Sequence, residues 1–297
     1  MSVAREGAGA PCATAVRPVK PPVFNPDWPD DVKIVYAHDM EEEWDRRRAP
    51  HLWNKHQDVM RRYRDLASAQ GRPLRILDVG CAQGTLALRL AEDGHDVVAI
   101  DIRPQFLQYA ASRYERGHVR FVEGDALTLK IDETFDLVFA NQIIEHLVFP
   151  VAFVSRLHGW LTEGGELIMT TPNGEYVKNG LPHFSQIGDP TGLAGRQYSA
   201  DGDGHFFAYT AAELAVIVAE AGLVGVGVSF FETPWITGHM KVRWLHAVAP
   251  PGVLRALDRA TLAFPYAACR LGFQLMVRAR RSSSPVALSP RQTSSRR

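Results

Sequence analysis

Short apolar runs alternate along the middle of the chain with segments whose apolar residues recur every three or four positions. Runs of four to eight apolar residues between polar turns are typical of strands that are buried on both faces. Their alternation with helical segments predicts a parallel sheet with crossover helices. The expected fold is α/β, a doubly wound, mostly parallel sheet of seven strands with helices on both faces, the strands being residues 74–79, 96–100, 118–122, 135–140, 166–171, 224–231 and 273–277.

The first residues of several helical segments carry the usual signals of a helix start. Pro104 suits the first turn of a helix, and Thr210 with Glu213 has the spacing of a capping box. A long amphipathic segment also precedes the first strand. The expected helices cover residues 41–66, 85–92, 104–114, 150–161, 210–222 and a stretch after Pro250.

Both ends of the chain lack hydrophobic periodicity, which divides the sequence into regions. Residues 1–30 are rich in Pro, Ala and Gly, and residues 282–297 in Ser, Arg and Pro, so we expect a flexible leader and a disordered basic tail. Between them we expect a helical lid region at residues 31–72 and one domain at residues 73–281. Inside this domain lie a loop too long for a plain connector, residues 172–209, and an insert, residues 234–270.

Charge and cysteine content narrow the choice of partners. The chain has 33 Lys plus Arg against 33 Asp plus Glu, so no overall field attracts it to nucleic acid or anionic lipid. No acidic residue follows Asp258, which favours a solvated basic C-terminal region over one that contacts phosphate or a membrane. Cys12, Cys81 and Cys269 are too far apart for a metal pair or a disulfide framework, and no apolar run reaches membrane-spanning length. We therefore expect a cytoplasmic protein with reduced cysteines.

A glycine-containing turn joins the first expected strand to its helix, in the run Ile76-Leu-Asp-Val-Gly-Cys-Ala-Gln-Gly84. Gly80 lets the backbone approach a ligand, and Gly84 lets the helix pack near the strand. The dinucleotide fingerprint needs a further glycine where Ala82 stands, so this spacing argues against a pyrophosphate ligand. Backbone N–H groups at the helix start suit a carboxylate, and Asp78 suits an ammonium group. The turn therefore predicts a site for a ligand that contains an amino acid.

Polar residues end the next three strands of the predicted sheet. Asp101 follows the second strand and suits the two hydroxyls of a ribose. Asp125 follows the third strand and suits an adenine amino group, while Asn141 and Gln142 end the fourth. Because open sheets bind ligands at the carboxyl ends of their strands, these side chains are expected around one nucleoside-containing ligand.

With these motifs, residues 74–232 resemble the class I S-adenosylmethionine-dependent methyltransferases, which have a Rossmann-like sheet. The segment Leu161-Thr-Glu-Gly-Gly-Glu-Leu-Ile-Met169 also resembles that family's turn into its fifth strand. The style of the motifs is most similar to that of the ubiquinone-pathway small-molecule O-methyltransferases. The resemblance implies S-adenosylmethionine as cofactor, S-adenosylhomocysteine as product, and a cofactor site made of Asp78, Gly80, Cys81, Ala82, Gly84, Asp101, Ile102, Asp125, Ala126, Asn141 and Gln142.

The residues just after the fourth strand suggest how an acceptor hydroxyl loses its proton. His146 is expected to face the acceptor, where a near-neutral imidazole is a suitable base; its alternative is a structural histidine. By resemblance to the ubiquinone-pathway enzymes and to small-RNA terminal 2′-O-methyltransferases, Glu145, His146 and His205 imply a divalent metal site, with His146 and His205 as catalytic residues. The chain departs from the RNA enzymes because Gln142 replaces their first acid and His205 stands alone for a histidine pair.

Three aromatic-containing regions are candidates to enclose an acceptor. The loop 172–209 is expected to shape its pocket. The helical region before the first strand offers a lid through Trp44, His51, Trp53 and His56, although packing is the alternative. The insert 234–270 either closes an apolar pocket or lies on a membrane beside a lipid-like acceptor; its modest cationic content and Pro265 favour packing.

These observations favour methylation of a small-molecule acceptor, at the oxygen of a sugar, phenol or natural product, with nitrogen and carbon acceptors still open. An RNA 2′-O-methyltransferase is the alternative enzyme, but balanced charge argues against a nucleic-acid partner. A module that binds the cofactor without catalysis is a third hypothesis. The sequence does not indicate the oligomeric state.

Overall fold

A central mixed sheet confirms the expected architecture. The structure is a computed structural model that describes residues 2–3, 26–27, 33, 47, 49–196 and 205–283. All seven expected strands are present, and a two-residue strand, β1, pairs antiparallel with β4 at one edge. The order across the sheet is β1-β4-β3-β2-β5-β6-β8-β7, with β8 antiparallel to both of its neighbours. The strands are β1 (Ser2–Val3), β2 (Arg75–Val79), β3 (Asp96–Asp101), β4 (His118–Glu123), β5 (Phe135–Asn141), β6 (Leu161–Pro172), β7 (Leu223–Phe231) and β8 (Gln274–Arg281).

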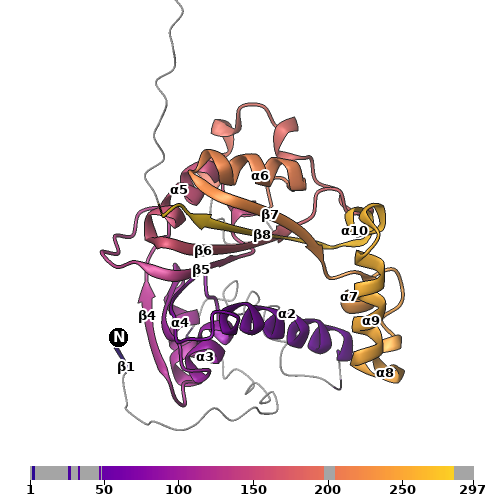
Figure 1. Ribbon diagram of the computed structural model, residues 1–297, viewed down its shortest axis with the longest axis horizontal. Coiled ribbons are helices and arrows are strands. Elements are labelled where there is room, and N and C mark those ends of the chain that lie inside the picture. Colours follow the sequence, from indigo (N-terminus) through magenta and orange to yellow (C-terminus); the bar gives the residue numbers. More distant parts are fainter. Residues whose placement is uncertain are drawn as a thin grey trace, which may run out of the picture.

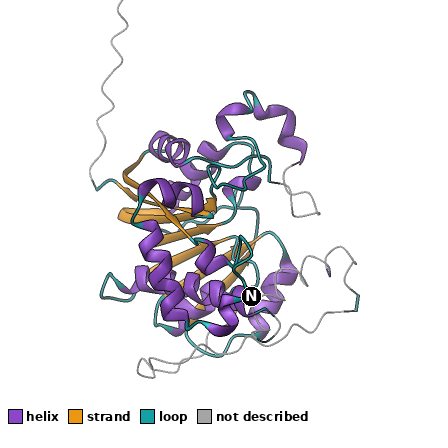
Figure 2. Ribbon diagram, turned by 90° about the vertical axis from the view of Figure 1, so that its right-hand side faces the viewer, coloured by secondary structure: helices purple, strands orange, loops and turns teal. Residues whose placement is uncertain are grey.

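Helices cover both faces of this sheet, as Figures 1 and 2 show. Helices α5 and α6 pack on one face, and α2, α3 and α4 pack on the other. A third group, α7 to α10, lies at the β7–β8 end of the molecule (Figure 1). The helices are α2 (Pro50–Ser68), α3 (Thr85–Glu92), α4 (Pro104–Ser112), α5 (Pro150–Trp160), α6 (Ala211–Glu220), α7 (Pro234–Thr237), α8 (Leu245–Val248), α9 (Pro251–Leu262) and α10 (Pro265–Leu271), with short 3₁₀ turns η1 (Ile144–His146), η2 (Phe184–Gln186) and η3 (Pro190–Arg196).

The two cores follow from the period of two along each strand. In β2, Leu77 and Val79 join the core under α5 and α6, whereas Ile76 joins the core under α2, α3 and α4. Both sets of side chains are buried, which explains why the strands appear as continuous apolar runs. Asp78 shares the parity of Ile76 and therefore turns toward the α2–α3 layer.

The expected helix starts at Pro104 and Thr210 are confirmed. Pro104 is the first residue of α4. Thr210 and Glu213 exchange the two hydrogen bonds of a capping box at 3.2 and 2.7 Å, with each side chain accepting from the other's backbone N–H. Strand β6 begins earlier than expected, at Leu161. The Gly164-Gly165 turn lies within the strand, where the register of its pairing with β5 shifts between Phe135 and Leu137.

The helix before the first strand is confirmed for its described part. Helix α2 begins at Pro50, and proline suits its first turn. Residues 41–46 and 48 of the expected helical segment lie outside the described residues. Trp44, most of the leader and lid region before residue 49, and the tail after residue 283 lie outside the described residues. What is described of the lid region is therefore one amphipathic helix that packs against α3, α7 and α8.

The long loop after β6 is folded against the core. Phe207 and Tyr209 are fully buried, and isolated bridges join Asn173 to Tyr209 and His183 to Ala208. Residues 197–204, which include Tyr198, are outside the described residues. The loop therefore has a structural part in addition to its expected role beside an acceptor.

The insert does not pack as expected. Leu254 is buried, but Trp244, Phe264 and Tyr266 are 62%, 67% and 81% exposed. Helical spacing alone does not say which face of a helix meets the protein, and here large apolar side chains face outward. No helix among the described residues has the length and apolar character needed to cross a membrane.

Candidate functional site

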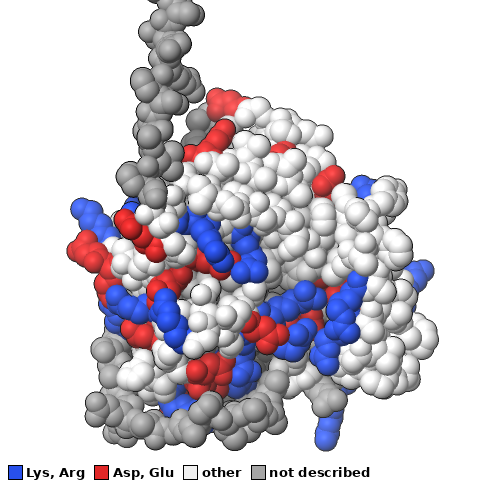
Figure 3. All heavy atoms as spheres, in the orientation of Figure 1, with Lys and Arg blue, Asp and Glu red and all other residues white. Residues whose placement is uncertain are grey.

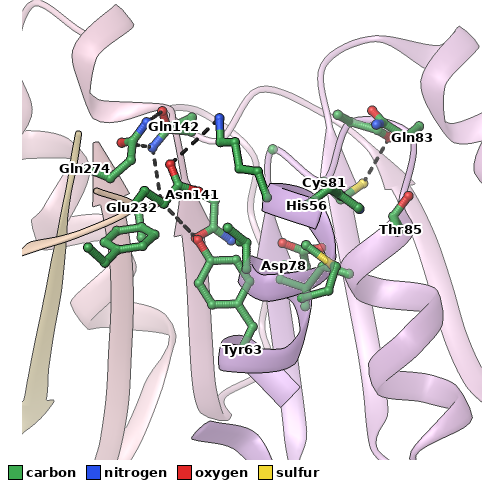
Figure 4. A pocket seen from close by; sticks show the side chains of 18 of the residues that line it. His56, Tyr63, Asp78, Cys81, Gln83, Thr85, Asn141, Gln142, Glu232 and Gln274 are labelled. Carbon is green, nitrogen blue, oxygen red and sulfur yellow. Dashed lines mark hydrogen bonds and ion pairs between the residues drawn. The ribbon is translucent and has the colours of Figure 1, made fainter. Parts of the chain in front are cut away.

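A cavity of about 290 Å³ lies at the edge of the sheet where β2, β5 and β6 end. Figure 4 shows Asp78 and Cys81 on one side, the side chains of Asn141 and Gln142 on the other, and Tyr63 between them. Helix α2 covers the cavity with one face, whose residues are spaced three or four apart. The cavity is lined by Leu52, Lys55, His56, Val59, Met60, Tyr63, Asp78, Gly80, Cys81, Ala82, Gln83, Thr85, Leu86, Asn141, Gln142, Thr170, Phe231, Glu232 and Gln274.

The turn from β2 into α3 requires glycine at two positions. Gly80 has φ +63°, and a Cβ there would lie 2.6 Å from Ile143 Cδ1. Gly84 has φ +72°, and a Cβ there would lie 2.6 Å from the Cβ of Ala110. Ala82, which replaces a possible third glycine, also has a positive φ, +45°. This backbone lies close to its neighbours and is strained where it lines the cavity, as is common at binding sites.

Asp78 carries an unsatisfied oxygen at the base of this turn. Its side chain is 3% exposed, and Oδ2 accepts no hydrogen bond from the described residues. Burial, and secondarily the charge of Asp101, raise the pKa of Asp78 to about 7. A buried carboxylate with a spare oxygen is stabilised by a cationic partner, so Asp78 fits the ammonium group of an amino-acid ligand.

Asp101 lies beneath the same turn but does not line the cavity. Its Oδ2 accepts from Ala82 N–H at 2.8 Å and its Oδ1 from Arg103 N–H at 2.9 Å. Burial raises its pKa, and these two backbone bonds oppose the rise. Asp101 therefore orders the turn, and each carboxylate oxygen keeps a second lone pair for a ligand hydroxyl. Ile102 beside it is 43% exposed.

The turn after β4 brings Asp125 next to the end of β3. Gly124 N–H donates to Asp101 O at 3.0 Å, and Asp125 Oδ1 accepts from Leu127 N–H at 2.8 Å. Asp125, Ala126, Gly84, Asp101 and Ile102 are not among the lining residues, whereas Asp78, Gly80, Cys81, Ala82, Asn141 and Gln142 are. The cavity thus holds the part of the expected site assigned to the amino-acid end of the ligand, and the nucleoside contacts stay predictions.

A network of neutral polar side chains lines the β5–β6–β8 side of the cavity. Gln142 and Gln274 exchange amide hydrogen bonds at 2.9 and 3.1 Å. Thr170 donates to Asn141 Oδ1 at 3.1 Å, accepts from Gln142 Nε2 at 3.2 Å and lies 3.3 Å from the Tyr63 hydroxyl. Burial raises the pKa of Tyr63, so its phenol stays protonated. Gln142 holds a positive φ, +54°, which the paired amides stabilise.

Glu232 and Lys55 form the charged end of the cavity, which the sequence interpretation missed. Glu232 follows β7, is 3% exposed and has φ +59°. Its Oε2 lies 3.7 Å from Lys55 Nζ, and burial raises its pKa against the pull of that lysine. Thr170, Glu232 and Gln274 stand at strand ends on the ligand-binding edge; that position was the available signal for finding them.

The three expected metal-binding residues come together near the end of β5, although none of them lines the cavity. One ligand atom from each of Glu145, His146 and His205 lies within 4.8 Å of the others. Glu145 is fully buried; its Oε2 accepts from Thr171 Oγ1 at 3.0 Å, and its Oε1 accepts no hydrogen bond from the described residues. Burial raises the pKa of Glu145 to about 8. The rings of His146 and His205 meet edge to face with centroids 4.7 Å apart. An orphaned buried oxygen beside two imidazoles fits a divalent cation.

An open sheet with a glycine turn after β2, an acid at the end of β3 and a cavity at its carboxyl edge is typical of α/β domains that bind nucleoside-containing ligands. Residues 77–169 match the family model described as a methyltransferase domain. Solved structures of S-adenosylmethionine-dependent methyltransferases share the fold. Residues 77–169 therefore belong to a methyltransferase domain, and the chain has the fold of S-adenosylmethionine-dependent methyltransferases.

The curated relatives match only the central part of the chain. An uncharacterized methyltransferase of Mycobacterium tuberculosis (strain H37Rv) is 35% identical over 111 residues, 37% of this chain and 56% of the relative. The ubiquinone biosynthesis O-methyltransferase of Roseobacter denitrificans is 33% identical over 115 residues, 37% of this chain and 46% of the relative. The match therefore spans about half the length of these relatives.

Two solved structures show the extent of the shared fold. Magnesium protoporphyrin IX methyltransferase from Synechocystis, solved with bound S-adenosylhomocysteine, has a TM-score of 0.54 at 15% identity and covers 84% of this chain and 95% of that one. A SAM-dependent methyltransferase from Archaeoglobus fulgidus has a TM-score of 0.52 at 17% identity, with 83% and 99% coverage. At these identities the likeness concerns the fold alone.

Proposed function

We propose that this protein transfers the methyl group of S-adenosylmethionine to a hydroxyl of a small molecule, such as a sugar, a phenol or another natural product. The observation that carries the proposal is Asp78, a buried carboxyl with an unsatisfied oxygen beside a glycine turn in a cavity at the ligand-binding edge. In this proposal, Asp78 binds the ammonium group of the cofactor's methionine portion. Asp101 and Asp125 bind its ribose and adenine, and Asn141 and Gln142 lie beside its sulfonium.

The proposed reaction is a direct displacement. A lone pair on the acceptor oxygen forms the new O–CH₃ bond as the C–S⁺ bond breaks, its electrons return to sulfur, and S-adenosylhomocysteine leaves. The acceptor proton passes to a base. The chain's contribution is mainly to hold acceptor and methyl group in line while α2 excludes water.

The identity of the base is the point at which the geometry changes the sequence-based expectation. His146 was expected to face the acceptor, yet it is not among the residues that line the cavity. His56 and Glu232 do line it, and the raised pKa of Glu232 brings that carboxylate closer to the basicity useful near neutral pH. His146 and His205 remain in the proposal as holders of a metal ion together with Glu145.

A divalent cation at Glu145, His146 and His205 would lower the pKa of a hydroxyl bound to it. Glu145 would supply Oε1, and Thr171 would orient its carboxylate through Oε2. Because the pKa of Glu145 is about 8, cation binding must displace its proton at neutral pH. Cation affinity should therefore rise with pH, which titration calorimetry with Mg²⁺ or Mn²⁺ on wild type and Glu145→Gln would measure.

The first test of the proposed function is calorimetric titration with S-adenosylhomocysteine. Asp78→Asn should weaken binding by about tenfold or more, because the neutral amide loses the charge-assisted bond to the ammonium group. Asp65→Asn, at a carboxylate that is 65% exposed on α2, is the matched control and should bind as wild type does. No binding by folded wild type would contradict the cofactor site.

If binding is found, the acceptor class can be tested directly. Transfer of a labelled methyl group to hydroxylated small molecules, with amine analogues in parallel, should label the hydroxyl compounds. Labelling of the amines alone would contradict O-methylation while leaving the cofactor site intact. Binding without transfer to any acceptor would instead favour the non-catalytic hypothesis.

A further inference from the structure

Large apolar side chains are exposed mainly on the insert. Twelve such side chains are exposed among the described residues, and seven of them lie within residues 240–266. Exposed apolar residues scattered singly are ordinary, whereas a concentration of them on consecutive short helices is typical of an interaction surface. We call this group the insert patch: Met240, Trp244, Val248, Val253, Leu257, Phe264 and Tyr266, which are 42%, 62%, 70%, 49%, 38%, 67% and 81% exposed.

Helix α9 is turned so that its apolar stripe faces outward. Val253 and Leu257 are one turn apart on the exposed face, and Phe264 just beyond the helix continues that stripe. On the neighbouring face, about 100° around the helix, Leu254 and Asp258 are buried. Asp258 fixes this orientation, because its Oδ1 accepts from the backbone N–H and the hydroxyl of Thr233 at 3.0 and 2.8 Å, and its Oδ2 from Arg62 at 3.0 Å. The exposure of the stripe is therefore held by specific bonds.

The charge around the insert patch has one sign. Asp258 is the only acidic residue between residue 238 and the end of the chain, and it is buried. Lys241, Arg243, Arg255 and Arg259 form no ion pair with any of the described residues. Over α8 and α9, the surface in Figure 3 shows uncharged and basic atoms without acidic ones. An apolar centre with unpaired cations beside it complements an anionic, partly apolar surface.

We propose that the insert patch is a docking surface for an anionic lipid membrane. Trp, Tyr and Phe side chains favour the headgroup region, and Lys and Arg side chains reach anionic headgroups while their stems stay against apolar surface. The short helices α8 and α9 would lie in the interface plane without spanning it, and the proposal does not depend on the chemistry in the cavity.

A second copy of the chain fits this surface less well. In a symmetric dimer the same patch meets itself, so the cations of one copy would face those of the other, and the insert itself offers no exposed carboxylate between them. Anionic headgroups supply the missing negative charge. The competing occupants remain distinguishable by experiment.

The test is sedimentation of the full-length protein with phosphatidylcholine vesicles with and without phosphatidylglycerol. Wild type should bind the anionic vesicles and dissociate as salt is raised. Lys241→Gln/Arg243→Gln should weaken binding by about tenfold or more. Arg116→Gln/Lys130→Gln, which removes the same charge at exposed sites outside the insert, should weaken it much less.

A second pair of variants tests the apolar centre. Trp244→Ala/Phe264→Ala should also lose vesicle binding, whereas Val216→Ala, at an exposed valine of α6, should not. Thermal unfolding and S-adenosylhomocysteine titration of every variant report folding independently of lipid. Failure of wild type to bind anionic vesicles would overturn the proposal, with sedimentation equilibrium then reporting whether the chain self-associates. Binding that persists in both insert variants would place the lipid contact elsewhere, for example at the C-terminal arginines, and would also overturn it.

Discussion

Two of the regions that contain buried carboxylates give those carboxylates opposite surroundings. At the edge of the sheet, Asp78 Oδ2 and Glu145 Oε1 accept no hydrogen bond from the described residues, and burial raises the pKa of both groups. At the contact of α2 with α9, Asp58 and Asp258 are as deeply buried but bind Arg62, with further bonds from Arg61 and Thr233.

This difference separates a binding site from a structural contact. A buried carboxylate with all its partners has its desolvation offset by the protein itself. One with an orphaned oxygen is costly when ionised, and it is stabilised only when a ligand supplies the missing partner. The orphaned oxygens at the sheet edge therefore support the proposed binding site, whereas the α2–α9 contact stabilises the position of the insert.

The largest expected effect is at the structural contact. Asp258→Ala removes the acceptor of two bonds from Thr233 and one from Arg62, and leaves these donors without it. We expect a loss of about 2–4 kcal/mol in the free energy of unfolding. The loss is not larger because Arg62 is partly exposed and still forms its ion pair with Asp58. Urea unfolding measures the loss. Leu257→Ala, one residue away on the exposed face, should change stability by less than about 1 kcal/mol; equal losses would contradict the assigned orientation of α9.

A smaller effect of opposite sign is expected at Glu145. Its folded-state pKa, about 8, lies above its ordinary value of 4.5, so the folded state retains a proton that the unfolded state releases. The favourable contribution of the protonated group is complete below pH 4.5 and is lost as pH rises to about 8. At about pH 9 the free energy of unfolding of Glu145→Gln should therefore exceed that of wild type by on the order of 2 kcal/mol, with little difference at about pH 4.5, which urea unfolding at the two pH values measures. A variant that is less stable at the higher pH would show that the ionised Glu145 is stabilised in the folded chain by more than its bond from Thr171.

The smallest effect concerns the pH dependence of cofactor binding. Asp78 must ionise to pair with an ammonium group, and its pKa is about 7. Wild-type affinity for S-adenosylhomocysteine should therefore rise between about pH 5.5 and 7.5, by up to about tenfold per pH unit below the pKa. Calorimetry across this range measures the slope. Asp78→Asn should be nearly flat, and a wild-type profile as flat as that of the variant would remove Asp78 from the ammonium site.

The period of the apolar residues was enough to predict the sheet and most of its helices. Strands buried on both faces appear as continuous apolar runs. The turn at Gly80 and Gly84 allows only a few residue types, because its φ values are positive and a Cβ at either glycine would lie 2.6 Å from a neighbouring side chain. Such local constraints leave a clear trace in the sequence. The methyltransferase class was likewise predicted from motifs at consecutive strand ends, and the comparisons confirm it.

The acceptor side could not be predicted in the same way. Lys55, Glu232 and Gln274 line one cavity although they come from α2, the end of β7 and the start of β8. Glu232 and Gln274 come together because β8 lies antiparallel between β6 and β7, and no local sequence pattern predicts that strand order. The packing of α2 over the cavity adds Lys55. His146 lies just after the end of β5, where a side chain facing the acceptor was expected. The 3₁₀ turn η1 instead places it beside Glu145 and His205, outside the lining of the cavity.

The sequence by itself determined the order of strands and helices, the glycine turn at β2 and the acids at the ends of β3 and β4, because each depends on contacts between residues close in the chain. Only the tertiary structure decided which face of α9 meets the protein. An amphipathic helix has two faces, and a core, a ligand pocket and a membrane can each accept the apolar one. In this chain Asp258, bound by Thr233 and Arg62 from distant segments, turns the side of α9 that carries Leu254 and Asp258 inward and leaves Val253, Leu257 and the following Phe264 exposed.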